Sequence, residues 1–300
     1  MIYTLTLNPA LDYALRLPVL REGETNRAET AVLRFGGKGI NVSCILRELG
    51  VKTCALGFVA GFTGVALEDE LMRRGIPTSF IHLSEGLTRI NVKVSAATTE
   101  TEINGVGPAI PPEAVEALYE QLDSLTPADT LVLAGSIPPS LPCELYGRIG
   151  EKMKAGGIRF VVDAEGNALE AALPYRPFLV KPNRAELEGW LGRALPTKED
   201  LRAAAEALQR AGAANVLVSL GGDGALLLDE YGNFHQAPAP QIHLVSAVGA
   251  GDSMVAGFLA SYAGSPHDYE GALRLGIAAG SATAASDGLA DRAAIARLME

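Results

Sequence analysis

The chain has 300 residues, of which 48% are hydrophobic and 20% are charged, and its formal net charge is −10. That length and apolar content allow a large buried core in one large α/β domain or two small ones, and we expect a single domain over residues 1–300. The acidic balance, without a basic cluster, argues against nucleic acid as a partner. The three cysteines form no C-x-x-C pair, which argues against a disulfide framework and a zinc site.

The N-terminus enters a strand-like run at once, without a basic region or a cleavage site. No apolar run approaches the roughly 20 residues that a membrane helix needs. We therefore expect a cytoplasmic protein in a reducing compartment, with no membrane partner.

Three strands are predicted before the first helix. Residues 2–7 read as a buried strand that an Asn-Pro pair ends. Residues 11–17 alternate, so that the apolar side chains lie on one face and Asp12 lies on the other. Residues 26–35 are again strand-like. One side of the second strand can therefore meet a polar ligand.

A glycine turn at residues 36–39 opens the first predicted helix, which has an apolar stripe over residues 42–49 and Gly50 as its stop. The turn is not a Walker A loop, which needs Gly-Lys-Ser or Gly-Lys-Thr. Tight packing of the strand against the helix explains the glycines. It does not explain Lys38 and Asn41.

A strand over residues 87–94 interrupts the alternation of strands and helices that predicts a parallel sheet. It carries Arg89, Asn91 and Lys93 on one face and apolar residues on the other. Residues 99–105 are its predicted partner, and the pair is expected to join the earlier strands in a small separate sheet. Charges on a solvated strand face are the ordinary explanation for this pattern.

The other predicted elements follow the α/β rhythm. The predicted helices are 64–74, 112–125, 141–155, a helix beginning after 183, 198–209 and 269–285; the predicted strands are 53–59, 130–134, 158–163, 178–180, 216–220, a pair within 225–236, and 241–245. The last helix is rich in Ala and Gly, so we expect it to pack closely against a neighbour.

Polar residues follow several of these strands. Ligands of open parallel sheets gather at the carboxyl ends of the strands, so Ser136, Asp163 and Lys181 are candidates for the rim of a site. Asn183 and Glu186 have the spacing of a helix N-cap and its capping box, which explains both structurally. Lys181 needs another explanation.

The period of the sequence changes from two to about 3.6 at Gly249–Gly251, between a strand-like run and a helix. Unpaired N–H groups at a helix start attract anions, and a glycine turn lets an anion approach them. Asp252 would stand beside that anion. Phosphoryl transfer needs both features, donors for phosphate charge and an acceptor for the proton of the nucleophile. The alternative is an Asp that only complements the helix dipole.

In combination, these stretches resemble the ribokinase-like (PfkB) carbohydrate kinases over nearly the whole chain. The matching stretches are TLNPALD (6–12), GGKGINV (36–42), TRINVK (88–93), AGS (134–136), KPNRAEL (181–187) and VGAGDS (248–253). The resemblance implies a three-layer α/β/α sandwich with a mostly parallel central sheet and a small β-lid, formed by about 11–35 and 87–106. It also implies a homodimer that pairs through the lid.

The resemblance further implies a role for each matching residue. Asp252 is the expected base, with Gly249, Ala250 and Gly251 as its catalytic turn. The expected substrate-binding residues are Asp12, Gly37, Lys38, Asn41, Arg89, Asn91, Lys93 and Ser136, with Arg89 and Lys93 on the phosphate that the sugar already carries. The expected nucleotide-binding residues are Lys181, Asn183, Glu186, Ser219, Gly221, Gly222, Val248 and Gly280. Mg²⁺ is expected near Asn183 and Glu186, mostly through water and phosphate oxygens, so no direct protein ligand is assigned.

Within the family, the Leu-Asn-Pro-Ala opening, the 88–93 strand and Thr-Glu-Ile-Asn-Gly at 101–105 look most like the members that phosphorylate fructose 1-phosphate. The expected reaction transfers phosphate from ATP to the C6 hydroxyl of D-fructose 1-phosphate and gives fructose 1,6-bisphosphate and ADP. The alternatives are a kinase for tagatose 6-phosphate or fructose 6-phosphate, and a phosphosugar-binding protein without activity.

Two departures from the family pattern flank the expected site. Ala247 stands where the family usually has Thr, and residues 163–166 replace the more usual Asp-x-Ser. They leave the nucleotide and ion preference open, whereas Gly249, Gly251 and Asp252 are intact.

Overall fold

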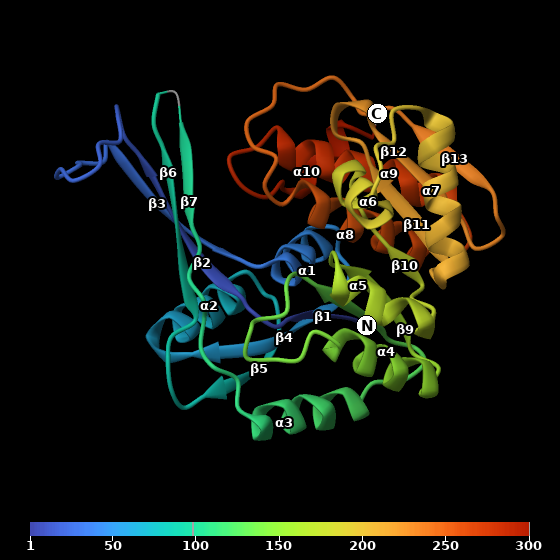
Figure 1. Cartoon of the computed structure of the whole chain (residues 1–300), viewed down its shortest axis with the longest axis horizontal. Helices are drawn as coiled ribbons and strands as arrows, with labels where there is room; N and C mark the ends of the chain where they lie inside the picture. Colours follow the sequence, from blue (N-terminus) through green and yellow to red (C-terminus); the bar gives the residue numbers. More distant parts are fainter. Residues whose placement is uncertain (98, 300) are drawn as a thin grey trace.

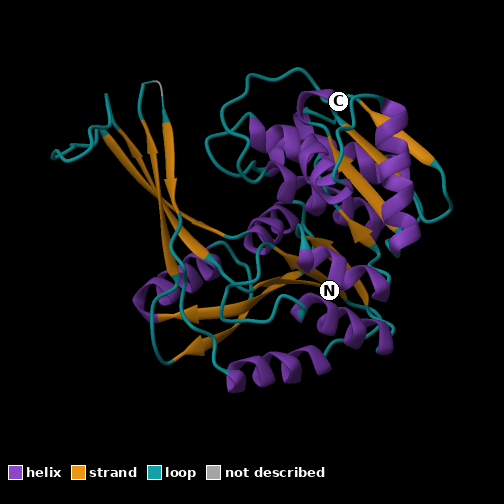
Figure 2. Ribbon diagram, viewed as in Figure 1, coloured by secondary structure: helices purple, strands orange, loops and turns teal. Residues whose placement is uncertain are grey.

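The computed structural model describes residues 1–97 and 99–299, and within them a nine-stranded sheet runs through the molecule (Figures 1 and 2). Its strands are β1 (Ile2–Thr6), β4 (Thr53–Ala60), β5 (Thr78–Leu83), β8 (Thr130–Ala134), β9 (Arg159–Asp163), β10 (Leu179–Val180), β11 (Asn215–Ser219), β12 (Ala225–Leu228) and β13 (Phe234–Ala237). They lie in the order β13-β12-β11-β10-β9-β8-β1-β4-β5. Neighbours from β5 to β11 are parallel, whereas β12 and β13 are antiparallel additions at one edge.

Helices cover both faces of this sheet. They are α1 (Lys38–Glu48), α2 (Gly61–Arg73), α3 (Pro112–Asp123), α4 (Leu145–Ala155), α5 (Asn167–Ala172), α6 (Arg184–Leu191), α7 (Lys198–Ala211), α8 (Ala250–Gly264), α9 (Tyr269–Ala284) and α10 (Arg292–Arg297), with short 3₁₀ turns at Leu173–Tyr175 and Gly221–Asp223. Helices α3 to α7 share one core cluster with the sheet, and α1, α2, α8, α9 and α10 share the clusters on the other face.

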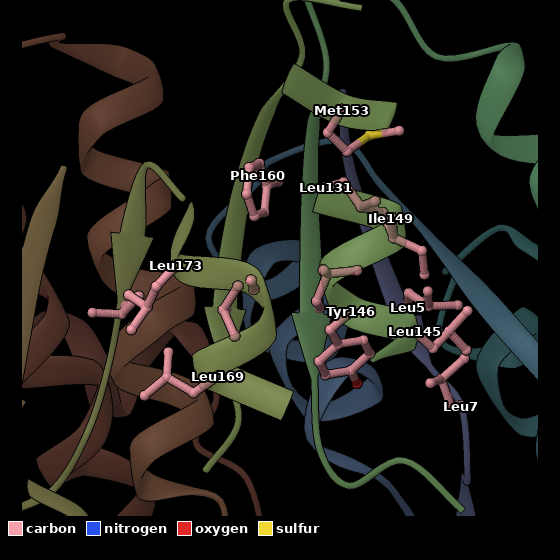
Figure 3. Close-up of a cluster of buried hydrophobic side chains, with 14 of the residues drawn as sticks. Leu5, Leu7, Leu131, Leu145, Tyr146, Ile149, Met153, Phe160, Leu169 and Leu173 are labelled. Carbon is pink, nitrogen blue, oxygen red and sulfur yellow. The ribbon is translucent and has the colours of Figure 1, made fainter. Parts of the chain in front are cut away.

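The strands supply both cores because side chains alternate between the faces. Leu131 and Leu133 of β8 point into the α3–α7 core, and Val132 and Ala134 point into the other. Figure 3 shows Leu131 and Phe160 beside Tyr146 and Ile149 of α4 in the first core. The expected three-layer sandwich with a mostly parallel sheet is confirmed.

A second sheet stands apart from the layered body, at the left of Figure 1. It has four strands, β2 (Ala10–Arg16), β3 (Thr30–Gly36), β6 (Arg89–Ser95) and β7 (Glu100–Ile103), in the order β3-β2-β6-β7. Strand β6 is parallel to β2 and antiparallel to β7. This is the expected small lid sheet, although β3 begins at Thr30 rather than at residue 26.

The strand predicted over residues 241–245 is wrong, because this segment is an irregular loop. Pro238 and Pro240 precede it and lack the N–H groups that a ladder needs. Its backbone donors turn instead to the last turn of α9, where the Val245 and Ser246 amides both donate to the Ala284 carbonyl, at 2.9 and 3.1 Å. Strand β5 and the short helices α5 and α10 were not predicted.

The close approach expected of the Ala- and Gly-rich helix is confirmed, and its neighbour is α8. A Cβ built on Gly280 would lie 3.0 Å from the Ala250 carbonyl oxygen, and one on Gly276 would lie 3.0 Å from that of Met254. Among the described residues, no helix combines the length and apolar character needed to cross a membrane.

Candidate active site

A cleft of about 1050 Å³ opens beside the carboxyl ends of β10 and β11 in the main sheet. Open parallel sheets gather ligands at the carboxyl ends of their strands. The cleft is lined by the lid strands, by the starts of α1 and α8, and by residues that follow β10 and β11. The fold therefore brings most of the predicted stretches to one place.

The glycine turn before α8 forms one wall of the cleft. Gly249 is the N-cap residue with φ of 79°, a left-handed conformation that suits glycine, and Asp252 lies in the first helical turn. Ser253 ties the turn to its surroundings, because its hydroxyl lies 2.8 Å from the Gly249 carbonyl and 2.8 Å from the Thr283 hydroxyl. The free N–H groups of this helix start are held in place beside the Asp252 carboxylate.

Asp252 is 6% exposed, and one of its oxygens, Oδ2, accepts a hydrogen bond of 2.7 Å from Asn41 Nδ2 on α1. Burial raises the pKa of Asp252 to about 7, and the negative charge of Asp163 acts in the same direction. The Asn41 bond and the cations of Lys38 and Lys181 oppose these effects on the pKa. A carboxylate with a pKa near neutrality is suited to accept a proton during a reaction.

Asp163 lies at the end of β9 and holds two lysines. Its Oδ1 is 3.3 Å from Lys38 Nζ and 3.5 Å from Lys181 Nζ. Its Oδ2 is buried and has no hydrogen-bond partner within the described residues. Lys181 also approaches the α8 turn, since a Cβ on Gly251 would lie 3.1 Å from its Nζ. Two cations therefore lie beside the helix start, where phosphate charge is best stabilised.

The lid presents its polar face to the cleft. Asp12 Oδ1 accepts a 2.8 Å hydrogen bond from Asn91 Nδ2, and Asp12 Oδ2 lies 3.2 Å from Lys93 Nζ. Arg89 is half-buried, its Nε has no hydrogen-bond partner in the described part of the chain, and burial lowers its pKa. The solvated strand face considered from sequence is not what the structure shows, because Asn91 is only 7% exposed.

The opposite end of the cleft is bounded by the start of α6 and by apolar residues. The Asn183 side chain accepts from the Glu186 amide at 2.8 Å, and Glu186 Oε2 accepts from the Asn183 amide at 2.9 Å. The predicted capping box is therefore confirmed. Small and apolar side chains form the remaining wall. They are Ala239, Pro240, Ile242, Leu244, Ala247, Met254, Ile277 and Ala284.

Most of the predicted site residues line this one cleft. They are Asp12, Gly37, Lys38, Asn41, Arg89, Asn91, Lys181, Asn183, Glu186, Ser219, Gly221, Gly222, Val248, Gly249, Ala250, Gly251, Asp252 and Gly280. Lys93 and Ser136 are not among the residues that line it, and Ser136 is exposed.

The sequence predicted Asp163 only as a candidate for the rim of a site and did not predict that it pairs with both Lys38 and Lys181. The sequence reasoning also missed the apolar wall from residues 239–247, because that segment was predicted as a strand. No group of three or more His, Cys, Asp or Glu side chains within residues 1–97 and 99–299 could hold a metal ion by itself.

Known proteins resemble this chain in sequence and in fold. The sequence profile of the family described as pfkB family carbohydrate kinase matches residues 4–294. The 1-phosphofructokinase of Bacillus subtilis (strain 168) is 44% identical, over 100% of this chain and 97% of that protein. The D-tagatose-1-phosphate kinase of Bacillus licheniformis is 36% identical, over 97% of this chain and 95% of that protein. The crystal structure of phosphofructokinase-2 from Escherichia coli in complex with substrates and products has a TM-score of 0.92 and 33% identity, over 99% of this chain and 98% of that chain.

A glycine turn at a helix start, a buried carboxylate and a ribokinase-like fold are the features of the class, which is that of the carbohydrate kinases. The chain belongs to the pfkB family of these kinases. It is accordingly a sugar-phosphate kinase that uses ATP.

Proposed function

We propose that the enzyme is a 1-phosphofructokinase, which phosphorylates D-fructose 1-phosphate at its C6 hydroxyl. The observation that carries the proposal is that Asp252, Arg89 and Lys181 line one cleft. A base that shares a cleft with cations from two different parts of the chain suits a reaction in which both substrates carry phosphate. The Bacillus subtilis relative at 44% identity is a 1-phosphofructokinase, which supports this choice of substrate.

Arg89 is the proposed ligand of the phosphate that the sugar already carries. Its half-buried guanidinium has an unpartnered Nε, and a planar cation of this kind binds phosphate oxygens well. Asp12, Gly37 and Asn41, which line the cleft, are the proposed contacts for the sugar hydroxyls. Ser136, which does not line it, is not retained as one. Asp12 and Asn41 lie on the same side of the cleft, since a Cβ on Gly36 would be 3.9 Å from an oxygen of each.

In the proposed reaction, Asp252 accepts the proton of the C6 hydroxyl while that oxygen forms a bond to the γ-phosphorus of ATP. The bond from the γ-phosphorus to the oxygen that bridges it to the β-phosphate breaks, and ADP leaves with the electron pair. The N–H groups of Gly249, Ala250 and Gly251 and the cations of Lys38 and Lys181 stabilise the negative charge of the transferring group.

We propose that Mg²⁺ lies near the start of α6. Asn183 and Glu186 line the cleft there, and side-chain oxygens are the donors that Mg²⁺ prefers. We propose that these residues hold Mg²⁺ largely through water. The ion would neutralise phosphate charge when bound. Ser219, Gly221, Gly222, Val248 and Gly280 are proposed to border the nucleotide.

A homodimer through the lid is proposed as well. The lid face that points away from the cleft exposes apolar side chains, including Tyr13 at 39%, Leu33 at 46% and Ile103 at 61%. A contiguous exposed apolar face is typical of an interaction surface.

Residues 1–300 are proposed to act as a single kinase domain, with about 11–35 and 87–106 as its lid.

Tagatose phosphates are the second candidate substrates, because one relative is a D-tagatose-1-phosphate kinase. Tagatose and fructose differ only in the stereochemistry of one hydroxyl group. A hydrogen-bonding site for that hydroxyl is able to separate the two substrates.

A coupled assay of ADP release tests the proposal. Purified enzyme is supplied with ATP, Mg²⁺ and, in turn, fructose 1-phosphate, tagatose 1-phosphate, tagatose 6-phosphate, fructose 6-phosphate and fructose. We expect the highest kcat/KM with fructose 1-phosphate. A higher value with another phosphosugar assigns the enzyme to that substrate, and no turnover on any would favour a phosphosugar-binding protein without activity.

A further inference from the structure

Arg89 and Lys93 carry positive charge on the same face of β6, but their surroundings differ. Arg89 forms no ion pair with any residue that the structure describes. Lys93 lies 3.2 Å from Asp12 Oδ2 and 3.7 Å from Glu102 Oε1. Two carboxylates therefore already surround the Lys93 ammonium, and it has little charge to offer to an incoming phosphate.

The register of the lid explains this arrangement. Glu102 of β7 is directly opposite Lys93, and the residue beside Lys93 on β2 is Ala14, which is small. Lys93 reaches diagonally along β2 to Asp12, whose direct neighbour is Asn91. Diagonal neighbours of this kind are within reach of long side chains.

Both oxygens of Asp12 contact side chains of β6. Asn91 Nδ2 donates to Asp12 Oδ1 at 2.8 Å, and the side-chain oxygen of Asn91, Oδ1, accepts from the Gly105 amide at 3.2 Å. Lys93 holds Oδ2, and its side chain is 24% exposed. Asp12 lines the cleft whereas Lys93 does not. The Asp12 carboxylate is therefore fixed in direction before a sugar hydroxyl donates to it.

We propose that Lys93 is a positioning residue that acts through Asp12, so that it supports recognition of the sugar hydroxyls, while Arg89 alone takes the phosphate. The inference rests on the proposed function, because it assigns Asp12 to the sugar. An acceptor whose direction is already fixed loses less conformational entropy when a ligand binds to it. Removal of Lys93 therefore weakens sugar binding, even though Lys93 does not contact the sugar.

Two double-mutant cycles test the proposal, with kcat/KM measured on whichever phosphosugar the wild-type enzyme uses best. The first combines Lys93→Met with Asp12→Asn, and the second combines Lys93→Met with Arg89→Gln. We expect Lys93→Met alone to lower kcat/KM about 10- to 100-fold, mainly through KM for the sugar, with KM for ATP unchanged. Its effect should shrink to about threefold or less in the Asp12→Asn background and stay undiminished in the Arg89→Gln background.

The opposite pattern overturns the proposal. An undiminished loss in the Asp12→Asn background, or a loss that disappears in the Arg89→Gln background, would assign Lys93 to the phosphate. Lys93→Arg is the conservative control and should retain most of the wild-type kcat/KM. The same cycles with Lys93→Gln guard against a folding defect of Lys93→Met. If the wild-type enzyme prefers fructose 6-phosphate, the proposed function is wrong, but the two cycles still test the role of Lys93 on that substrate. If the enzyme turns over no phosphosugar, both proposals are contradicted.

Discussion

Asp252 shows how its surroundings prepare one side chain for chemistry. Burial and the Asp163 charge raise its pKa to about 7, while Asn41 and the two lysines favour its ionised form. A base with a pKa near the working pH is ionised often enough to react and still basic enough to accept a proton. The sequence indicated the residue and its glycine turn, but the pKa depends on groups from three distant strands and helices.

The pH dependence of kcat/KM follows from this pKa. Activity should rise as Asp252 loses its proton and reach a plateau above about pH 7. Asp163→Asn removes a charge that raises the pKa of Asp252, so the midpoint should move to lower pH even if the maximum rate falls. A midpoint that stays in place, in rate profiles of both enzymes, would argue that another group controls the reaction.

The ionised Asp252 carboxylate should also lower the free energy of unfolding at neutral and higher pH. A folded-state pKa above the unfolded value of 3.8 favours folding at low pH, and that contribution is lost as the pH rises toward and through 7. Asp252→Asn should therefore raise Tm at pH 8 by a few degrees, and by less at pH 5. Thermal melting at both pH values checks this. If Asp252→Asn has a lower Tm than the wild type at pH 8, the claim that a buried, ionised carboxylate destabilises the fold is contradicted.

The helices α6 and α7 begin with the same kind of N-terminal cap, so one can serve as a control for the other. Asn183 and Thr197 each complete a capping box, but only Asn183 lines the cleft. Either residue changed to Ala should cost about 1 kcal/mol of stability. Only Asn183→Ala should also raise KM for ATP. Denaturant titration and kinetics of both variants provide the test, and equal KM values would make the Asn183 cap purely structural.

Elements with strong local signals were predicted from sequence, because their stabilising contacts are encoded locally. The capping box of α6, the glycine turn of α8 and the polar face of β6 all depend on nearby residues. The prediction for the segment 241–245 failed for the opposite reason. Its alternation is that of a strand, but Pro238 and Pro240 precede it and the Val245 amide donates to the Ala284 carbonyl on α9. The apolar wall of the cleft was missed with it.

In the whole molecule, the lid sheet has one face toward the cleft and the other toward solvent. Its polar face closes one side of the cleft, and its apolar face is exposed. The sequence predicted that these strands form a separate sheet. It could not predict that Lys93 turns to Asp12, since this depends on the register between β2 and β6.

A polar substitution on the exposed lid face tests the proposed dimer. Ile103→Asp places a charge at a side chain that is 61% exposed, and it should convert a dimer to a monomer in light scattering after size exclusion. Tyr231→Asp is the control, since Tyr231 is 64% exposed near the opposite edge of the main sheet. A wild-type enzyme that is monomeric at micromolar concentration would contradict the proposal.

The formation of fructose 1,6-bisphosphate by the wild type and by Asp252→Asn, followed by ³¹P NMR with fructose 1-phosphate, ATP and Mg²⁺, tests the central claim most directly. We predict that the wild type forms a new C6 phosphoester as ADP accumulates. The variant should still bind both substrates but turn over at least about 10³-fold more slowly, because it lacks the base. A near-normal rate for the variant, or no C6 phosphoester from the wild type, would contradict the account.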